Sequence, residues 1–585
     1  MDKREIAELL DEMGTLLELK GENPFRVRAY RNAALVISTI TADIAQLVSA
    51  GTLTSVKGVG KGLAGLIAEL VTTGTSKEFE ELRNSIPAGL REMLRIQGLG
   101  PKRVRVLYEK MAITTIDELK QACEEHRLRT IGGFGAKTEE NILHSIAHLA
   151  STASKHLYST AEEIAGIMAS ALRELPTVRR CEVAGSVRRR KELIGDVDLI
   201  ASVEAKHREK VFDRFTTHER VASVIARGET KSSVLMKNGM QCDLRLVEAD
   251  EYPFALNYFT GSKEHNVGMR SRALKAGWSL NEYGFSKAPD GARRSGPIPR
   301  CRDERDIYAA LGLEYIPPEL REDQGEFEAA EHGHIPKLVT PDDIRGTFHC
   351  HTTASDGVNT LDEMAAAAEA LGWQYLGIAD HSQAATYAGG LPPSRAKAQM
   401  KAIDRWNERA KGFRIFKGTE CDILADGSLD YPDALLAQFD YVVASIHSRF
   451  KMTQAEATAR LVKALRHPHV TMLGHPTGRL LLEREGYPVD MTEVVTVAAG
   501  EGKAIEINAH PMRLDIDWRY LHFAKQKGLR IFINPDAHTT EGLNDVRFGV
   551  GIARKGWLEP SDIVNCGTTA RVAAILRDMK PSTVR

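Results

Sequence analysis

The stretch GSVRRRKELIGDVD, residues 185–198, decides the fold of the region around it. Its two acids, Asp196 and Asp198, lie in the apolar run LIGDVDLIASV, whose β-branched and aliphatic residues predict a buried strand. Residues two apart on a strand point to the same face, which places the carboxylates roughly 6 to 7 Å apart along the chain. Two acids on one face of an apolar strand are costly unless a cation lies between them, and a divalent metal suits such oxygen ligands. The alternative is a pair of solvent-facing acids on an edge strand.

A phosphate-binding loop is predicted directly upstream of these acids. Gly185 and Ser186 follow the strand-like CEVA, and the basic run of residues 188–191 comes next. A glycine lets backbone N–H groups approach an anion, a serine adds a hydroxyl donor, and arginine binds phosphate bidentately. A third acid, Asp243, lies in the alternating strand MQCDLRLV. Three carboxylates beside phosphate donors predict two-metal phosphoryl transfer, with Mg²⁺ or Mn²⁺ as the ions.

This combination is similar to the palm of family X DNA polymerases, the DNA polymerase beta family. The resemblance continues through YFTGSKEHNVGMR (258–270) and NEYG (281–284), so it also covers the nucleotide-facing subdomain after the palm. It implies an α+β nucleotidyltransferase palm whose catalytic, metal-binding residues are Asp196, Asp198 and Asp243. It further implies these dNTP-binding residues: Ser186, Arg189, Tyr258, Phe259, Gly261, Lys263, Asn266 and Arg270. Asn266 and Arg270 are four apart, which places them on one face if that segment is helical.

Length and composition limit the class of protein to which this chain can belong. A chain of 585 residues is too long for one core, and 43% hydrophobic with 27% charged residues is ordinary for a soluble globular protein. No apolar run approaches about 18 residues and the first residues are charged, so we expect no membrane span, no signal peptide, and a cytoplasmic, nucleoid-associated protein. Seven cysteines without C-x-x-C spacing fit reduced thiols. The net charge of −1 is uninformative, because local placement of charge decides DNA binding.

Helices with glycine-rich turns are predicted at the N-terminus. An early helix carries the apolar stripe Phe25, Val27, Tyr30, Ala33, Ala34 and Ile37. After it, a G-x-G core leads into a helix three times, in SVKGVGKGLAGLIAEL (55–70), RIQGLGPKRVRVLYEK (95–110) and RTIGGFGAKTEENILHSI (129–146). These repeats resemble helix-hairpin-helix motifs, in which backbone N–H groups and a helix N-terminus meet a DNA phosphate; the alternative is plain structural turns. The implied DNA-binding residues are Gly58, Gly60, Lys61, Gly98, Gly100, Lys102, Gly133, Gly135 and Lys137.

One position departs from the DNA polymerase beta family. The N-terminal domain of that family can hold a Schiff-base lysine that removes a 5′-deoxyribose phosphate. Aligning GVGKGLAGLI with the family's motif puts Leu66 where this lysine would stand. We therefore expect 5′-phosphate binding through Lys57 or Lys61, without the nucleophile of a family-type lyase.

A linker is predicted at residues 316–345, which contain four prolines and a charge run but no sustained periodicity. The predicted domains are an N-terminal helical DNA-binding domain (1–85), a second helix-hairpin-helix region (86–150), the palm (151–250), the nucleotide-binding subdomain (251–315), the linker (316–345) and a C-terminal domain (346–585).

The C-terminal domain alternates short apolar runs with helical stretches, the βα pattern of a barrel or parallel sheet. Seven of the runs lead to histidines, acids or other polar residues: TFHCHT, LGIADH, FKGTEC, VVASIH, TMLGHP, IEINAH and IFINPDAH. Parallel α/β folds place their chemistry at the C-terminal ends of strands. Imidazole combined with carboxylate suits zinc, manganese or iron.

This pattern resembles the PHP domain, a distorted (βα)7 barrel of phosphoesterases with up to three clustered metals. The resemblance implies nine metal ligands: His349, His351, Asp356, His381, Glu420, His447, His475, Asp536 and His538. It implies up to three Zn²⁺ or Mn²⁺ ions, and we interpret the nearby Asp380 and His510 as supporting residues. A family X polymerase fused to such a domain is the bacterial X-family architecture.

The leading hypothesis is a template-directed DNA polymerase that fills short gaps in base excision or end repair, with a PHP-domain 3′-5′ exonuclease or 3′-end-processing activity. The expected partners are gapped or primer-template DNA and dNTPs, for a monomer without membrane contact. One alternative is a template-independent nucleotidyltransferase, since GS…DxD…D is shared across that superfamily. Another joins the polymerase to a small-molecule phosphatase of the histidinol phosphatase kind, and a third is a DNA-end scaffold without activity.

Overall fold

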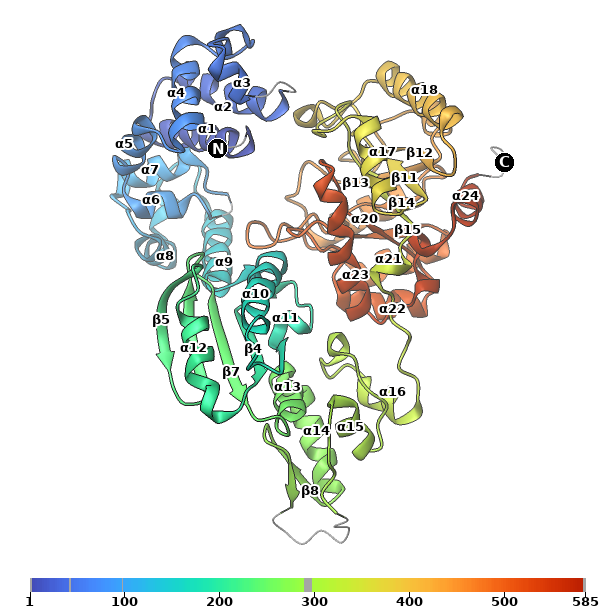
Figure 1. Ribbon diagram of the computed structural model, residues 1–585. Helices are drawn as coiled ribbons and strands as arrows, with labels where there is room; N and C mark the ends of the chain where they lie inside the picture. The colour runs from blue at the N-terminus through green and yellow to red at the C-terminus, as the bar shows by residue number, and fades with distance from the viewer. Residues whose placement is uncertain (1–2, 41–43, 97, 289–296, 582–585) are drawn as a thin grey trace. The chain divides into compact units, whose positions relative to one another are not determined.

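The structure is a computed structural model that describes residues 3–40, 44–96, 98–288 and 297–581. The chain divides into two compact units, Met1–Ala153 and Ser154–Arg585. The three predicted kinds of architecture, an all-α N-terminal region, an α+β palm and a C-terminal α/β barrel, are all confirmed (Figure 1).

Helices build the first unit. They are α1 (Lys3–Lys20), α2 (Pro24–Thr39), α3 (Ile44–Ser49), α4 (Lys61–Thr73), α5 (Lys77–Asn84), α6 (Ala88–Met93), α7 (Pro101–Met111), α8 (Ile116–Glu124) and α9 (Ala136–Thr152). One hydrophobic core joins them, and the predicted apolar stripe of α2 faces it except at Phe25. Phe25 is 75% exposed in the first turn, with the Arg28 guanidinium over its ring. Leu66 of α4 lies inside the core and is only 4% exposed.

A five-stranded sheet of order β2-β4-β7-β6-β5 forms the palm. Its strands are β2 (Arg180–Val183), β4 (Asp196–Ser202), β5 (Val221–Arg227), β6 (Lys231–Met236) and β7 (Gln241–Val247). β4 and β7 pair in parallel, whereas the other neighbours pair antiparallel. Helices α10 (Tyr158–Arg173) and α12 (Arg208–Thr216) pack against the sheet, and the short α11 (Gly185–Arg188) follows β2. Val197 and Leu199 are fully buried between sheet and helices, which explains why the strand is apolar apart from its acids.

The subdomain after the palm is mostly helical. It contains α13 (Tyr252–Thr260), α14 (Lys263–Lys275), β8 (Trp278–Leu280), β9 (Phe285–Lys287) and α15 (Glu304–Ala310).

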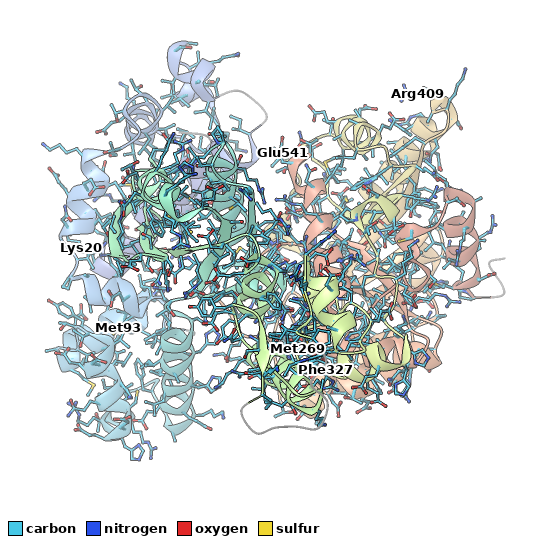
Figure 2. The ribbon with its side chains drawn as sticks, turned by 60° about the horizontal axis from the view of Figure 1, so that its bottom comes forward. Lys20, Met93, Met269, Phe327, Arg409 and Glu541 are labelled. Carbon is cyan, nitrogen blue, oxygen red and sulfur yellow. The ribbon has the colours of Figure 1, made fainter. Side chains whose placement is uncertain are left out.

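Part of the stretch 316–345, expected as a linker, is folded onto this subdomain. Helix α16 (Glu326–His332) places Phe327 in the same apolar cluster as Met269 of α14 (Figure 2). Glu326 is fully buried and lies 2.8 Å from Nδ1 of His265. The charge run therefore includes a buried carboxylate that is hydrogen-bonded to a histidine, which the local sequence does not reveal because the partner lies 61 positions upstream.

Seven parallel strands, adjacent in chain order, form the barrel. They are β10 (Gly346–Cys350), β11 (Tyr375–Ile378), β12 (Arg414–Asp422), β13 (Tyr441–Ser445), β14 (Met472–Leu473), β15 (Ala504–Asn508) and β16 (Arg530–Asn534). The last strand returns to the first, because Cys350 and Ala537 form a parallel bridge. All seven predicted strands are present. The helices between and after them are α17 (Leu361–Ala370), α18 (Pro393–Arg409), α19 (Asp433–Leu436), α20 (Gln454–Leu465), α21 (Met491–Gly500), α22 (Leu521–Gln526), α23 (Val546–Lys555) and α24 (Thr569–Asp578).

Within the described part of the chain, no helix has both the length and the apolar character that crossing a membrane requires. The seven cysteines are all unpaired.

Candidate active sites

Three carboxylates meet where β4 and β7 pair in parallel. Asp198 lies directly opposite Asp243 in the register, and Asp196 lies two residues before Asp198. One oxygen of each acid lies within 4.8 Å of the others. The structure thus brings the three predicted catalytic acids together as a group that could hold a metal ion.

Burial and mutual repulsion make this cluster hard to keep charged without a cation. Burial, followed by the charges of Asp196 and Asp243, raises the pKa of Asp198 to about 7. Burial and the charge of Asp243 also raise the pKa of Asp196. Burial alone would raise the pKa of Asp243 too, but hydrogen bonds from Lys231 and Gln241 lower it overall. Oxygen ligands that share such an excess of negative charge fit a divalent cation. Lys231, 2.5 Å from Asp243, was not predicted from the sequence.

Gly185 allows the predicted phosphate-binding loop to approach these acids. Its φ of +61° lies in the left-handed region. A Cβ atom on this residue would lie only 2.2 Å from Oδ2 of Asp198. Position 185 therefore excludes any side chain as long as Asp198 keeps its place.

Acidic partners already engage the basic run. Arg188 pairs with Glu304 through both terminal nitrogens, at 3.0 and 2.5 Å. Arg189 donates from Nε to Glu322 at 3.0 Å and from Nη1 to the Thr260 carbonyl at 2.5 Å. The half-buried Ser186 lies on α11, one turn before Arg189. The two predicted triphosphate ligands are thus neighbours beside the acids.

The other predicted dNTP-binding residues lie along α13 and α14. The rings of Tyr258 and Phe259 are 5.1 Å apart, edge to face, and Arg245 of β7 lies 4.1 Å from the Phe259 ring. The turn and α14 carry the rest: Gly261, Lys263, Asn266 and Arg270. Because residues 263–275 are helical, Asn266 and Arg270 do share one face. The Asn266 side chain donates to the Tyr258 carbonyl at 2.7 Å, which ties the two helices together.

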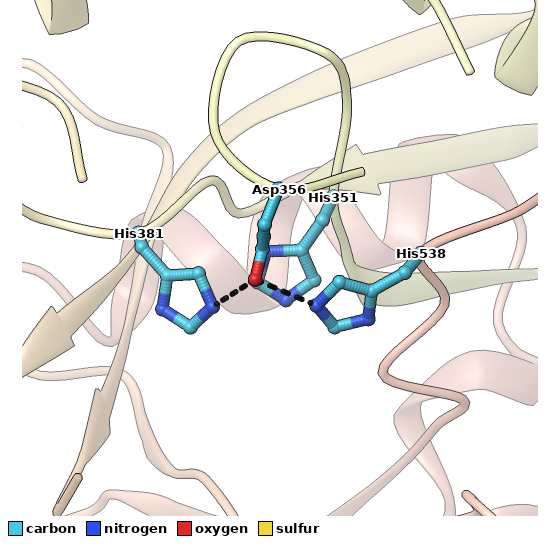
Figure 3. A group of neighbouring side chains, drawn as sticks. All are labelled: His351, Asp356, His381 and His538. Atoms are coloured by element: carbon cyan, nitrogen blue, oxygen red, sulfur yellow. Dashed lines mark ion pairs between the residues drawn. The ribbon is translucent and has the colours of Figure 1, made fainter. Parts of the chain in front are cut away.

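Nine side chains gather at the C-terminal ends of the barrel strands. They are the predicted ligands His349, His351, Asp356, His381, Glu420, His447, His475, Asp536 and His538. Glu420 is central, because its carboxylate lies within 4 Å of a ring nitrogen on each of five of these histidines. Asp356 lies between His381 and His538, at 3.4 and 3.3 Å, with His351 beside them (Figure 3).

These side chains form four overlapping groups that could each hold a metal ion: His351, Asp356, His381 and His538; His349, His351 and Asp536; His349, Glu420 and His475; His381, Glu420 and His447. The donor set fits such ions. Four buried ring nitrogens make no hydrogen bond within the protein: Nε2 of His349, and Nδ1 of His351, His381 and His475. Two of them, on His349 and His381, face the Glu420 carboxylate at 3.2 and 2.9 Å without hydrogen-bond geometry, and a zinc or manganese ion would satisfy imidazole and carboxylate ligands in this setting.

Neighbouring histidines keep the barrel acids ionised. Burial alone would raise the pKa of Glu420, but the charges of His447 and His349 lower it. The pKa of Asp536 is lowered in the same way despite its burial, chiefly by His349. An ionised carboxylate is the form that binds a metal.

Two acids that orient the ligands were missed in the sequence. Glu506 of β15 is fully buried, and its carboxylate lies 2.8 Å from Nδ1 of His349 and accepts the His475 backbone N–H at 2.8 Å. The Asp422 carboxylate likewise orients the His447 ring, because it lies 2.6 Å from Nδ1 of that histidine. Glu506 interrupts the apolar strand IEIN, which is the signal that identified Asp196 and could have identified it too.

The two residues interpreted as supporting ones have local partners. Asp380 is buried and accepts hydrogen bonds from Thr352 and Ser355. His510 accepts the backbone N–H of Met512 through Nδ1 at 3.3 Å.

The three G-x-G turns of the first unit share one backbone geometry. The first glycines, Gly58, Gly98 and Gly133, have φ between +88° and +101°. The second glycines, Gly60, Gly100 and Gly135, precede α4, α7 and α9 as extended caps without a side-chain hydrogen bond. Apart from Gly58, no heavy atom lies within 4 Å of a Cβ built on any of them. Five of the six turn glycines therefore lie at an open surface next to a helix N-terminus, where a phosphate can approach. All three lysines are exposed, and Lys102 and Lys137 lie 3.8 and 2.8 Å from Glu18 and Glu140.

Comparison with known proteins assigns a family to four regions of the chain. Family models match the helix-hairpin-helix domain at residues 1–76, the SAM-like helix-hairpin-helix tandem at 90–147, the DNA polymerase beta thumb at 255–322 and the PHP domain at 347–510. The chain is 38% identical over 579 residues to the DNA polymerase/3'-5' exonuclease PolX of Bacillus subtilis strain 168, covering 99% of this chain and 100% of that protein. The chain belongs to the bacterial family X DNA polymerases that carry a PHP domain.

This family X polymerase also resembles smaller proteins through its barrel. It is 31% identical over 199 residues to a probable phosphatase of Caldicellulosiruptor saccharolyticus and 33% identical over 199 residues to one of Acetivibrio thermocellus. Each match covers 32% of this chain and 78% of the phosphatase. The helix-hairpin-helix and thumb matches imply DNA binding, and polymerase and PHP domains generally use divalent metals.

Proposed function

We propose that the chain is a template-directed DNA polymerase that fills short gaps in base excision or end repair, and that its barrel is a 3′-5′ exonuclease or 3′-end-processing phosphoesterase. The observation that carries the proposal is the pair of separate candidate metal centres, one of three aspartates and one of nine ligands, in a chain that begins with helix-hairpin-helix turns. The identity with the Bacillus subtilis protein over the whole chain supports both activities.

In the palm, Asp196, Asp198 and Asp243 would hold two ions, Mg²⁺ or Mn²⁺. Such ions would lower the pKa of the primer 3′-hydroxyl and neutralise the triphosphate. Lys231 keeps Asp243 ionised, so that it can act as a ligand. The remaining residues bind dNTP: Ser186, Arg189, Gly261 and Lys263 at the triphosphate, Tyr258 and Phe259 at the sugar, and Asn266 and Arg270 at the minor-groove side of the base pair.

In the barrel, the nine ligands would hold up to three Zn²⁺ or Mn²⁺ ions, which would activate water and neutralise a phosphodiester. Tyr387 lies at the rim of this site, with its ring 6.2 Å from the rings of both His381 and His447. It is 62% exposed. An exposed aromatic ring beside the site offers a surface on which the last base of a strand can stack. This feature favours a nucleic-acid end over a small phosphate monoester.

The similarity to proteins named probable phosphatases supports a second candidate for the barrel, hydrolysis of small phosphate monoesters. Single-stranded DNA and a small phosphate monoester, compared under the same conditions, separate the two. Tyr387→Ala sharpens the comparison, because it should weaken only the reaction on DNA. For the palm, primer extension with and without a template separates the polymerase from a template-independent nucleotidyltransferase.

The proposed partners are gapped or primer-template DNA and dNTPs, bound by a monomer in the cytoplasm at the nucleoid. The domain ranges predicted from the sequence are part of the proposal, except that the nucleotide-binding subdomain (251–315), which the thumb family model matches, continues through α16 into the stretch expected as a linker.

The deciding experiment uses a labelled primer on a one-nucleotide gap with Mn²⁺, with and without dNTP. Asp196→Ala should abolish extension and leave primer shortening, whereas His349→Ala should do the reverse. If either substitution removes both activities, or neither removes any, the two-centre proposal is wrong.

A further inference from the structure

One buried lysine of the barrel reaches the basic run of the palm. Lys555, the last residue of α23, is 1% exposed. Its Nζ donates to Oε1 of Glu322 at 2.6 Å, to the Arg189 carbonyl at 3.1 Å and to the Glu319 carbonyl at 3.4 Å. All three ammonium donors are thus used, which offsets the cost of burying the charge.

The barrel helix is fitted closely to the palm at this point. A Cβ atom on Gly551, one turn before Lys555, would lie 2.8 Å from Cδ of Arg190. Nearby, Trp518 donates its ring N–H to Glu192 at 3.3 Å. The close approach at Gly551 and the hydrogen bonds of Lys555 and Trp518 therefore hold the barrel against residues 189–192.

Glu322 links the lysine to the arginine proposed to bind the triphosphate. Oε1 of Glu322, the same oxygen that accepts from Lys555, also accepts from Nε of Arg189 at 3.0 Å. Nη1 of Arg189 donates to the Thr260 carbonyl, beside Gly261. These two anchors fix the plane of the guanidinium, while Lys555 fixes the backbone of the same residue. The Arg189 side chain is only 12% exposed, so it has little room for other orientations.

We propose that Lys555 and Glu322 are positioning residues that hold Arg189 ready for an incoming triphosphate, so that the barrel takes part in nucleotide binding by the palm. The inference rests on the proposed polymerase function. An arginine that is already oriented loses less conformational entropy when it binds an anion, and this gain appears in the affinity for the nucleotide.

The test measures KM for dNTP and kcat of gap filling in the full chain. Lys555→Met should raise KM roughly tenfold or more, the usual effect of losing one partner of a buried charged hydrogen bond, with little change in kcat. Glu322→Gln, which keeps the shape of the side chain, should also raise KM. Lys503→Met is the matched control, because Lys503 is equally a buried barrel lysine but binds only the barrel carbonyls of Pro468 and Val470. Its KM should stay at the wild-type value, and metal-dependent hydrolysis by the barrel reports whether each variant folds.

Arg189→Gln distinguishes the proposed triphosphate contact of Arg189 from the proposed positioning role of Lys555 and Glu322. If Arg189→Gln leaves KM for dNTP unchanged, the proposed triphosphate contact is wrong and the inference is lost with it. If Arg189→Gln raises KM but Lys555→Met and Glu322→Gln behave like Lys503→Met, only the positioning role is wrong. Adding Lys555→Met to Arg189→Gln should raise KM no further, since the lysine acts through the arginine; additive effects would also overturn the inference.

Discussion

Replacing Gly185 with alanine tests how tightly the phosphate-binding loop is fitted to the acids. The added Cβ would lie 2.2 Å from Oδ2 of Asp198, and a separation below 3.0 Å is not tolerated. The carboxylate must therefore retreat by about 0.8 Å or more, unless the loop moves instead. A misplacement of about 1 Å at a reacting centre costs on the order of 100-fold in rate. The left-handed backbone at this position adds a stability cost of about 1 to 2 kcal/mol, too little to unfold the chain.

Single-turnover primer extension is the assay, at saturating dNTP and Mg²⁺. We expect the Gly185→Ala rate to fall about 100-fold, while 3′-end hydrolysis by the barrel stays at the wild-type level. Gly166→Ala is the control, because this glycine lies in α10 of the same subdomain with no atom within 4 Å of its Cβ position. An extension rate for Gly185→Ala close to that of Gly166→Ala would show that Asp198 need not hold its observed place, and would refute the reasoning.

Four further predictions follow from the same structure. Glu506→Gln should weaken metal binding by the barrel roughly 10- to 100-fold, because His349 loses its orienting carboxylate; calorimetric titration with Mn²⁺ measures this, and unchanged affinity would contradict it. Burial would raise the pKa of Glu304, but the charge of Arg321 and then the Arg188 pair lower it to about 2 from an ordinary value of 4.5. Its stabilising contribution of about 3 kcal/mol is therefore present above pH 4.5 and lost as the pH falls through 2, so wild type should lose more thermal stability over that range than Glu304→Gln. Gly98→Ala should weaken DNA binding, and the slope of the logarithm of the affinity against the logarithm of salt concentration should fall by about the value of one phosphate contact. Gly51 is another left-handed glycine but lies outside the hairpin turns, so Gly51→Ala should change neither the affinity nor this slope. Chelation should abolish both activities and lower the melting temperature, because a metal bound by the folded barrel stabilises it; a melting temperature that does not change with the chelator would argue against resident metals.

The sequence predicted those features of the fold that depend on the pattern of neighbouring residues. The seven barrel strands were recognisable because each is a brief apolar run that leads to polar residues at the barrel's edge. The sequence placed Asp198 and Asp243 on two strands, whereas the register that sets them opposite each other became visible only in the structure. Because strand ends of a parallel barrel converge, ligands spread over about 190 residues could be expected at one place.

Partners that lie far apart in the chain escaped prediction. Glu322 and Glu326 appeared in the sequence as part of a solvated charge run, yet each pairs with a buried or half-buried residue more than 60 positions away. Lys555 gave no signal at all, because a single lysine at the end of a helix is ordinary on a surface. Burial depends on how elements pack, and local composition carries no record of that packing.

The buried position of Leu66 limits what a single substitution at this place can do. A lysine at this place would have to put its amino group into the hydrophobic core formed around α4, where a charge is costly. A single substitution would therefore damage the fold before it supplied a nucleophile. A lysine at position 66 would act as a nucleophile only together with further changes that open this core to solvent.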